Sequence, residues 1–248
     1  MSRRVRVAVF RPDDERIDDA VELLSSLGGD PVPDPMLAVE ATGRTPEDAP
    51  YVVLTSKTGV ELAADRGWKP DPGTTLAAIG PATAEAARGV GWEVDLVPEE
   101  YTSAGLVTAL EGSVDGVRIE VARSDHGSDV LTDGLRAAGA DVHETVLYRL
   151  VRPADAGRST ELAADGELEA AAFTSSLTVE HFLEAAADRG IEEDAREGLS
   201  ATIVGAIGDP TRETAESHGI DVDVVPEEAT FDALATAVVE RAAPSYRE

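Results

Sequence analysis

The chain contains the stretch Val-Asp-Leu-Val-Pro-Glu-Glu-Tyr-Thr-Ser-Ala-Gly-Leu at residues 94–106 and a near copy, Val-Asp-Val-Val-Pro-Glu-Glu-Ala-Thr-Phe-Asp-Ala-Leu, at residues 222–234. Eight of the thirteen positions are identical, at a constant offset of 128. Each copy is expected to begin with a short buried strand, 94–97 or 222–225, that ends at a proline. Thr102 or Thr230 then follows and can cap the next helix, because its oxygen accepts from helix amides that lack a partner. An internal repeat of this kind predicts a duplicated fold.

The rest of the chain repeats in the same order. Residues 118–125 match 6–13, a predicted strand and turn, and the helix predicted after that first strand covers 14–27. Phe-Thr-Ser-Ser at 173–176 matches Leu-Thr-Ser-Lys at 54–57, and Gly-x-x-Thr occurs at 80–83 and again at 208–211. The offset grows from 119 to 128 between these landmarks, so the second copy carries nine extra residues near 185–199. We expect them to form a longer helix and loop.

Strands and helices alternate along the chain. The predicted strands at 51–54 and 75–79 are each followed by a helix, and this spacing favours an α/β fold with parallel sheets covered on both faces. Residues 30–36 contain three prolines and are expected at a sheet edge. The repeat allows either two contiguous domains or one domain inserted into the other. Polar segments at about 38–49 and 148–166 are the expected linkers, and they fall where an insertion needs its two crossings.

The composition is strongly acidic, with 49 Asp and Glu against 21 Lys and Arg and a net charge of −28. Such a surface argues against nucleic acid and anionic membranes as partners. The lysine-poor, acid-rich composition is similar to that of cytoplasmic proteins of salt-accumulating organisms, in which salt screens the surface charge. The chain has no cysteine, which excludes disulfides and thiol catalysis. No apolar run is long enough to span a bilayer and no signal peptide follows Met1, so a cytoplasmic location is expected.

Hydroxyl and glycine residues follow most of the predicted strands. In open parallel sheets, ligands bind beyond the carboxyl ends of the strands, and free amides at helix N-termini favour anions. One such hydroxyl alone is most simply a helix cap. Six positions together favour a cleft for a polyanionic ligand: Thr55-Ser56, Gly80 to Thr83, Thr102-Ser103, Thr174 to Ser176, Gly208 to Thr211, and Thr230.

Other kinds of site lack their motifs. The chain has no GxGxxG or GxxxxGK for nucleotide phosphates and no GxSxG nucleophile elbow. The four histidines show no paired spacing for a metal or a triad, so no metal site is expected and each is interpreted as an ordinary helix or strand-edge residue. They are His126, His143, His181 and His218.

Tyr148 stands out because its counterpart in the first copy is Leu37, so the repeat does not require a tyrosine there. A phenol with a pKa near ~10 is a poor base at neutral pH but a usable proton donor. The alternative is a strand-edge aromatic with its hydroxyl in water.

Taken together, these motifs resemble the uroporphyrinogen-III synthase family. The resemblance covers nearly the whole chain, in the right order. It rests on the strand ending at Arg11, Phe/Leu-Thr-Ser at 54–56 and 173–175, Gly-x-x-Thr at 80–83 and 208–211, Val-Pro-Glu-x-Tyr-Thr-Ser at 97–103, Gly139-Ala140-x-Val142, and Val146-x-Tyr148.

The resemblance implies two flavodoxin-like domains joined by a two-stranded linker, one formed by 1–37 plus 151–248 and the other inserted at 40–147. It also implies a cofactor-free cyclisation of hydroxymethylbilane, a linear tetrapyrrole with eight carboxylates, with inversion of ring D and loss of water. Tyr148 matches the family tyrosine most often linked to that loss. We further expect a monomer that makes transient contact with hydroxymethylbilane synthase.

The expected substrate contacts combine the strand-end hydroxyls with nearby basic and aromatic residues. A net charge of −28 would repel an anionic substrate, so we expect the cleft to be locally neutral or positive. Arg149 and Arg212 are further candidates for supplying that positive charge. Two departures from the family are Lys57, where an asparagine often follows Thr-Ser, and Ser128, where a basic residue is common. The alternative function is a non-catalytic module of the same fold that senses a small anion. The expected contacts are Arg11, Ser56, Lys57, Thr83, Tyr101, Thr102, Ser103, Arg123, Ser175, Ser176 and Thr211.

Overall fold

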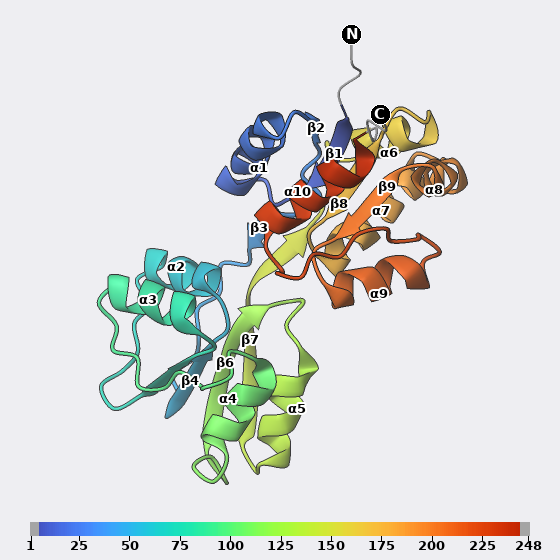
Figure 1. Ribbon diagram of the computed structural model, residues 1–248. Helices are drawn as coiled ribbons and strands as arrows, with labels where there is room; N and C mark the ends of the chain where they lie inside the picture. Colours follow the sequence, from blue (N-terminus) through green and yellow to red (C-terminus); the bar gives the residue numbers. More distant parts are fainter. Residues whose placement is uncertain (1–4, 244–248) are drawn as a thin grey trace. The chain divides into compact units, whose positions relative to one another are not determined.

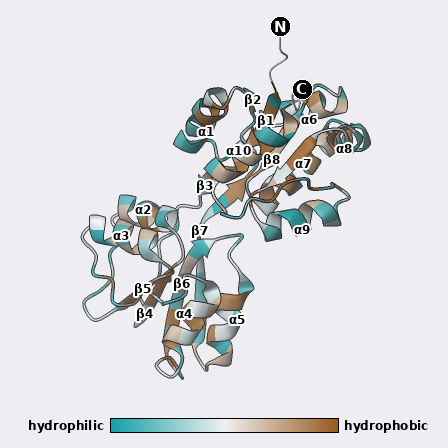
Figure 2. Ribbon diagram, in the orientation of Figure 1, coloured by the Kyte–Doolittle hydropathy of each residue, from teal (hydrophilic) through white to brown (hydrophobic). Residues whose placement is uncertain are grey.

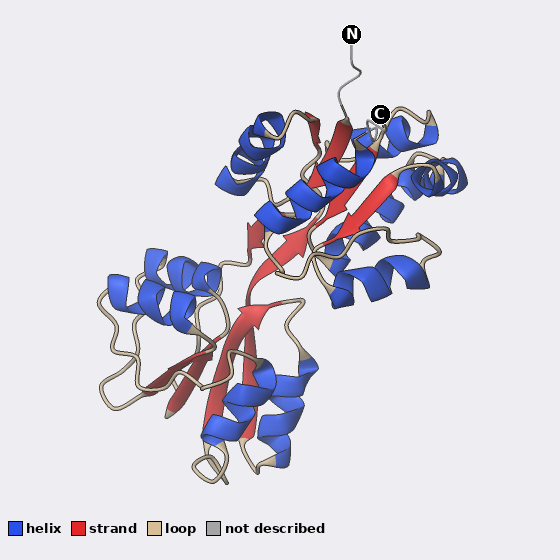
Figure 3. Ribbon diagram, viewed as in Figure 1, coloured by secondary structure: helices blue, strands red, loops and turns tan. Residues whose placement is uncertain are grey.

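The computed structural model describes residues 5–243, which form two compact α/β units (Figure 1). Unit 1 comprises the chain up to Ala38 and again from Val151 onward, and unit 2 comprises Val39–Leu150. Strands alternate with helices in both units, as the sequence pattern predicted (Figure 3). Within residues 5–243, no helix is long and apolar enough to cross a membrane.

Unit 1 is built on a four-stranded sheet with the order β2-β1-β8-β9, in which neighbouring strands are parallel. Ala8 and Phe10 of β1 belong to the core on one face, and Val7 and Val9 to the core on the other, because successive side chains in a strand point to opposite faces. The strands are β1 (Arg6–Phe10), β2 (Asp30–Pro33), β8 (Ala170–Phe173) and β9 (Ile203–Ala206); the helices are α1 (Glu15–Ser26), α6 (Arg158–Ala164), α7 (Ser176–Asp188), α8 (Glu192–Ser200), α9 (Asp209–Ser217) and α10 (Phe231–Ala242).

Unit 2 is built on a five-stranded sheet with the order β3-β7-β6-β4-β5. The pairs β7–β6, β6–β4 and β4–β5 are parallel, and apolar clusters cover both faces. In Figure 2 the strands are mostly hydrophobic, whereas the helices carry both hydrophobic and hydrophilic residues. The strands are β3 (Ala38–Ala41), β4 (Tyr51–Leu54), β5 (Thr75–Ala78), β6 (Arg118–Ser124) and β7 (Asp141–Val151); the helices are α2 (Lys57–Asp65), α3 (Pro81–Gly89), α4 (Ser103–Leu110) and α5 (Asp129–Ala137).

The repeated stretch confirms one expectation and corrects another. Thr102 and Thr230 cap α4 and α10, accepting from the amides of Gly105 and Ala233. The strands predicted at 94–97 and 222–225 are wrong, because each segment makes only an isolated bridge, at Leu96 or Val224.

In each of these segments an aspartate side chain takes the place of a backbone carbonyl in hydrogen bonding to the neighbouring strand. Asp95 Oδ2 accepts from Leu76 N–H at 2.8 Å, and the amide of Asp95 donates back to Leu76 O at 2.9 Å. Asp223 makes the same pair of bonds with Val204, at 2.9 and 2.8 Å. Asp95 and Asp223 therefore hydrogen-bond to the edge strands β5 and β9, where the sequence predicted a full additional strand.

The segment predicted as the second linker, 148–166, contains the end of β7, which continues to Val151, and α6 at Arg158–Ala164. Asp34, from a distant part of unit 1, is buried and accepts from the amides of Gly157 and Ser159 at 2.8 and 2.7 Å. A carboxylate at a helix N-terminus satisfies amides that otherwise lack partners, so α6 forms in a segment whose composition is that of a loop.

The extra residues of the second copy form a separate helix. The longer helix α7 ends before Gly190, whose φ of +70° is the left-handed conformation that commonly follows a helix, and α8 then begins at Glu192. A Cβ at Gly198 of α8 would lie 1.8 Å from the carbonyl oxygen of Ala163 in α6. Only glycine permits this close approach.

We predict that Gly198→Ala destabilises the protein by about 1–3 kcal/mol, the usual cost of overpacking a tight contact. Gly89→Ala is the matched control, because its Cβ would meet no atom within 4 Å and alanine favours the helix by about 0.5–1 kcal/mol. Thermal unfolding followed by circular dichroism measures both. Equal melting temperatures for the two variants would contradict the α6–α8 contact.

Candidate functional site

A cavity of about 180 Å³ lies at the carboxyl ends of the strands of unit 2. The lining residues lie at the ends of β6 and β7, in the segments after β4, β5 and β6, and on α4 and α5, which is where a ligand is expected in a parallel sheet. Arg123 is the one charged side chain among them. The lining residues are Thr55, Ser56, Ile79, Ser103, Arg123, Ser124, Gly127, Ser128, Leu131 and Tyr148.

Tyr148 of β7 is 7% exposed, and its phenol O–H donates to Ser56 Oγ at 3.0 Å. Ser56 is the N-cap of α2, and the same oxygen accepts from the amide of Gly59 at 3.0 Å. Because Ser56 Oγ accepts both of these bonds, neither of them uses its own hydroxyl proton. The phenol of Tyr148 is therefore held in a defined place beside a second hydroxyl.

Helix α2 must lie close to β7 for this bond to form. A Cβ at Gly59 would come within 3.1 Å of Ser56 Oγ and 3.3 Å of Leu147 Cδ1, tighter than most real contacts. Glycine at this position lets the start of α2 approach the strand that carries Tyr148.

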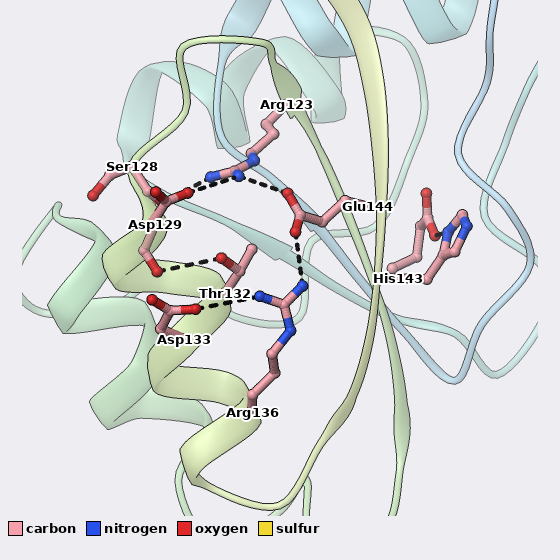
Figure 4. Close-up of polar contacts among 9 residues, drawn as sticks. Arg123, Ser128, Asp129, Thr132, Asp133, Arg136, His143 and Glu144 are labelled. Atoms are coloured by element: carbon pink, nitrogen blue, oxygen red, sulfur yellow. Dashed lines mark hydrogen bonds and ion pairs between the residues drawn. The ribbon is translucent and has the colours of Figure 1, made fainter.

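Arg123 reaches the cavity from β6 as part of an ion-pair network (Figure 4). Its guanidinium lies 2.6 Å from Glu144 Oε2 and donates to Ser128 O at 2.7 Å. Glu144 also binds Arg136 of α5, at 2.9 Å through its other oxygen. A Cβ at Gly127 would lie 2.5 Å from Arg123 Cδ, so glycine leaves the path for this side chain. The guanidinium of Arg123, which lines the same cavity as Tyr148, is thus held in place by Glu144.

His143 lies on the opposite side of β7 from this network, as Figure 4 shows. Its Nδ1 is 2.6 Å from Glu120 Oε2, and its Nε2 is 3.7 Å from Glu47 Oε1. Glu120 is fully buried, so the imidazole gives a hydrogen-bond partner to a carboxylate that is shielded from water. Among residues 5–243 no group of three or more His, Asp or Glu could hold a metal ion.

The structure brings four of the predicted site residues together around this cavity: Tyr148, Ser56, Ser103 and Arg123. The other predicted residues of unit 2 lie outside its lining. Lys57 is exposed and pairs with Glu61 at 3.4 Å, and Tyr101 is 61% exposed with its ring packed on Gly80. Thr102 serves as the cap of α4, and Thr83 is buried within α3.

The predicted residues of unit 1 are already engaged with their own unit. Arg11 lies over the ring of Phe231, 4.6 Å from its centroid, and burial lowers its pKa, with a further lowering from nearby Arg16. Ser175 caps α7, and Ser176 donates to Pro210 O at 3.1 Å. Thr211 is buried, only 3% exposed.

Sequence reasoning missed Ile79, Ser124, Gly127 and Leu131 as lining residues. Strand register could have found one of them, because Ser124 pairs with Tyr148 where the β6–β7 register shifts. Leu131 comes from the buried face of α5, for which an apolar pattern predicts only a core position.

Comparison with known proteins points to one family. A family model described as Uroporphyrinogen-III synthase HemD matches residues 18–236. The chain is 35% identical to the putative uroporphyrinogen-III synthase of Methanothermobacter thermautotrophicus, covering 94% of this chain and 96% of that protein. It is 28% identical to the uroporphyrinogen-III synthase of Synechococcus elongatus, covering 77% of this chain and 75% of that protein.

Two solved structures share the fold. One is a mutant uroporphyrinogen III synthase from Thermus thermophilus, with a TM-score of 0.65 and 22% identity over 96% of this chain and 98% of that one. The other is uroporphyrinogen-III synthetase from Helicobacter pylori, with a TM-score of 0.63 and 13% identity over 96% of this chain and all of the other (100%). At these identities the likeness concerns the fold alone.

We predict that Glu144→Gln destabilises unit 2 by about 1–3 kcal/mol, because it weakens the hydrogen bonds of two guanidinium groups, one of them buried. Glu61→Gln is the control, since its exposed pair with Lys57 on one helix face contributes about 0.2–0.5 kcal/mol. Both tryptophans, Trp68 and Trp92, lie in unit 2, so tryptophan fluorescence during urea unfolding reports on this unit. The network would be energetically unimportant if the two variants lost the same stability.

Proposed function

The chain belongs to the uroporphyrinogen-III synthase family, and we propose that the cavity around Tyr148 is part of its active site. The family match confirms the resemblance drawn from the motifs and favours the enzyme over the non-catalytic anion sensor. The protein is therefore a cyclising lyase of tetrapyrrole biosynthesis. Its reaction closes hydroxymethylbilane into a macrocycle with inversion of ring D.

The hydrogen bond from Tyr148 to Ser56 is the observation that carries the proposal for the site. A hydroxymethyl group departs as water only when its oxygen receives a proton. The phenol O–H of Tyr148 can supply this proton as the C–O bond breaks. The pyrrole nitrogen lone pair forms the new double bond, which leaves an electrophilic carbon for attack by ring D.

The surroundings of Tyr148 suit the phenolate that forms in this step. Ser56 can turn its hydroxyl to donate to the phenolate oxygen, because the amide of Gly59 keeps that serine in place. Arg123, which lines the same cavity and is held by Glu144, adds a fixed guanidinium donor. Fixed donors in a partly enclosed site stabilise developing charge without reorganising.

For substrate contacts we propose the strand-end groups that remain accessible. In unit 2 these are Lys57, Tyr101, Thr102 and Ser103; in unit 1 they are Arg11, Ser175 and Ser176. The backbone amides beside them can bind carboxylates, as free amides at helix N-termini do. Thr83 and Thr211 are left out of this set because their side chains are buried.

The two units further support an internal duplication with flavodoxin-like parallel sheets. Asp95 and Asp223 make matching bonds to β5 and β9, and the caps Thr102 and Thr230 also correspond. We propose that the chain crosses between the units through a two-stranded linker, formed by the start of β3 and the end of β7.

We predict that Tyr148→Phe slows formation of the type III isomer by roughly ten- to a thousandfold, the range over which a general acid contributes. Tyr51→Phe is the matched control, since Tyr51 lies in the same unit on β4 and outside the cavity. The assay couples a source of hydroxymethylbilane to separation of the type I and type III products. Wild-type protein that yields only the spontaneous type I isomer would refute the enzyme function; unchanged turnover of Tyr148→Phe would make this tyrosine structural.

A further inference from the structure

A second cavity of unit 2, of about 430 Å³, lies between the segment after β3 and the end of β7. Arg44 and Arg149 both line it. Neither belongs to the cavity around Tyr148, although Arg149 is the next residue after that tyrosine. The other lining residues are Glu40, Ala41, Thr42, Asp125 and Val146.

Thr42 fixes the segment that carries Arg44 against β7. Its amide donates to Leu147 O at 3.0 Å, and its hydroxyl donates to Val146 O at 2.7 Å. The amide of Arg44 then donates to Thr42 Oγ1 at 3.3 Å. The backbones that hold the two arginines are therefore joined by hydrogen bonds, while the side chains are exposed.

Both guanidinium groups are free of ion pairs within residues 5–243. By contrast, Arg118 pairs with Glu47, and Arg152 pairs with Asp188. The two arginines of this cavity keep their donors available.

The two acids that line this cavity, Asp125 and Glu40, differ in their hydrogen bonding. Asp125 Oδ1 accepts from the amide of Leu150 at 3.0 Å and lies 2.9 Å from His126 Nδ1. Burial raises the pKa of Asp125, but these hydrogen bonds outweigh that effect and hold the pKa below its ordinary value. Asp125 thus serves the protein's own backbone, and Glu40 is exposed.

We propose that Arg44 and Arg149 form a subsite that binds one side-chain carboxylate of a polycarboxylate tetrapyrrole. This inference rests on the proposed function, because that substrate class supplies the carboxylates. A guanidinium binds a carboxylate through two parallel N–H···O bonds, which gives orientation as well as attraction. The subsite positions the substrate and takes no part in proton transfer.

The test measures kcat and KM for hydroxymethylbilane in Arg44→Ala and Arg149→Ala. We expect KM to rise about three- to tenfold in each, as for the loss of a partly exposed charge-assisted contact, with kcat nearly unchanged. Arg149→Lys should recover part of the loss, since lysine keeps the charge but not the two-bond geometry. Glu40→Gln should lower KM, because it removes a like charge beside the ligand.

Arg88→Ala is the matched control, because it changes the net charge by the same amount in the same unit but lies at a different cavity. A parallel titration with uroporphyrin, an octacarboxylate macrocycle that is not turned over, measures binding without catalysis. The expected result is weaker uroporphyrin binding by the Arg44 and Arg149 variants and wild-type binding by the Arg88 variant.

The outcomes separate the two proposals. Wild-type protein without type III product refutes the proposed function, and the uroporphyrin titration still decides the subsite. An active wild-type protein whose Arg44 and Arg149 variants match Arg88→Ala in KM and in uroporphyrin binding refutes the subsite alone. A fall in kcat at unchanged KM and unchanged binding would also overturn it.

Discussion

Hydroxyl capping at the carboxyl ends of parallel strands is the interaction on which the rest of this structure depends. Parallel strands followed by helices bring the N-termini of those helices to one edge of each sheet, where amides need acceptors. Ser56, Thr102 and Ser128 supply them in unit 2, and Ser175 and Thr230 in unit 1. These caps lie at the edge where ligands bind in parallel sheets, so the groups that satisfy the helix amides are also the donors of the proposed site.

Much of this could be read from local sequence, because capping and strand burial depend on neighbouring residues. The caps Thr102 and Thr230 followed directly from the repeat. Contacts between distant residues could not be read in this way. The Tyr148–Ser56 bond joins residues 92 positions apart, and the cap of α6 reaches from Asp34 to Ser159 across 125 positions. Such contacts depend on which strands pair and in what register, and a local sequence pattern does not predict this.

The arginines show how an acidic protein can serve an anionic substrate. Most are neutralised by neighbouring carboxylates, and Arg123 is held by Glu144 even where it reaches the cavity. Screening by salt weakens the long-range repulsion from an overall charge of −28, whereas contacts at hydrogen-bond distance are screened much less. Recognition can then rely on a few oriented donors rather than on the sign of the whole surface.

The carboxylates of Asp95 and Asp223 have a consequence for solubility. Each bonds to the outer strand of its sheet, so the flanking segment covers β5 or β9 and leaves less open backbone for another chain to pair with. Exposed strand edges are templates for aggregation, and like charge ordinarily keeps them apart. Concentrated salt removes that protection. Covering an edge does not depend on charge, so this cover of β5 and β9 is the same at any ionic strength.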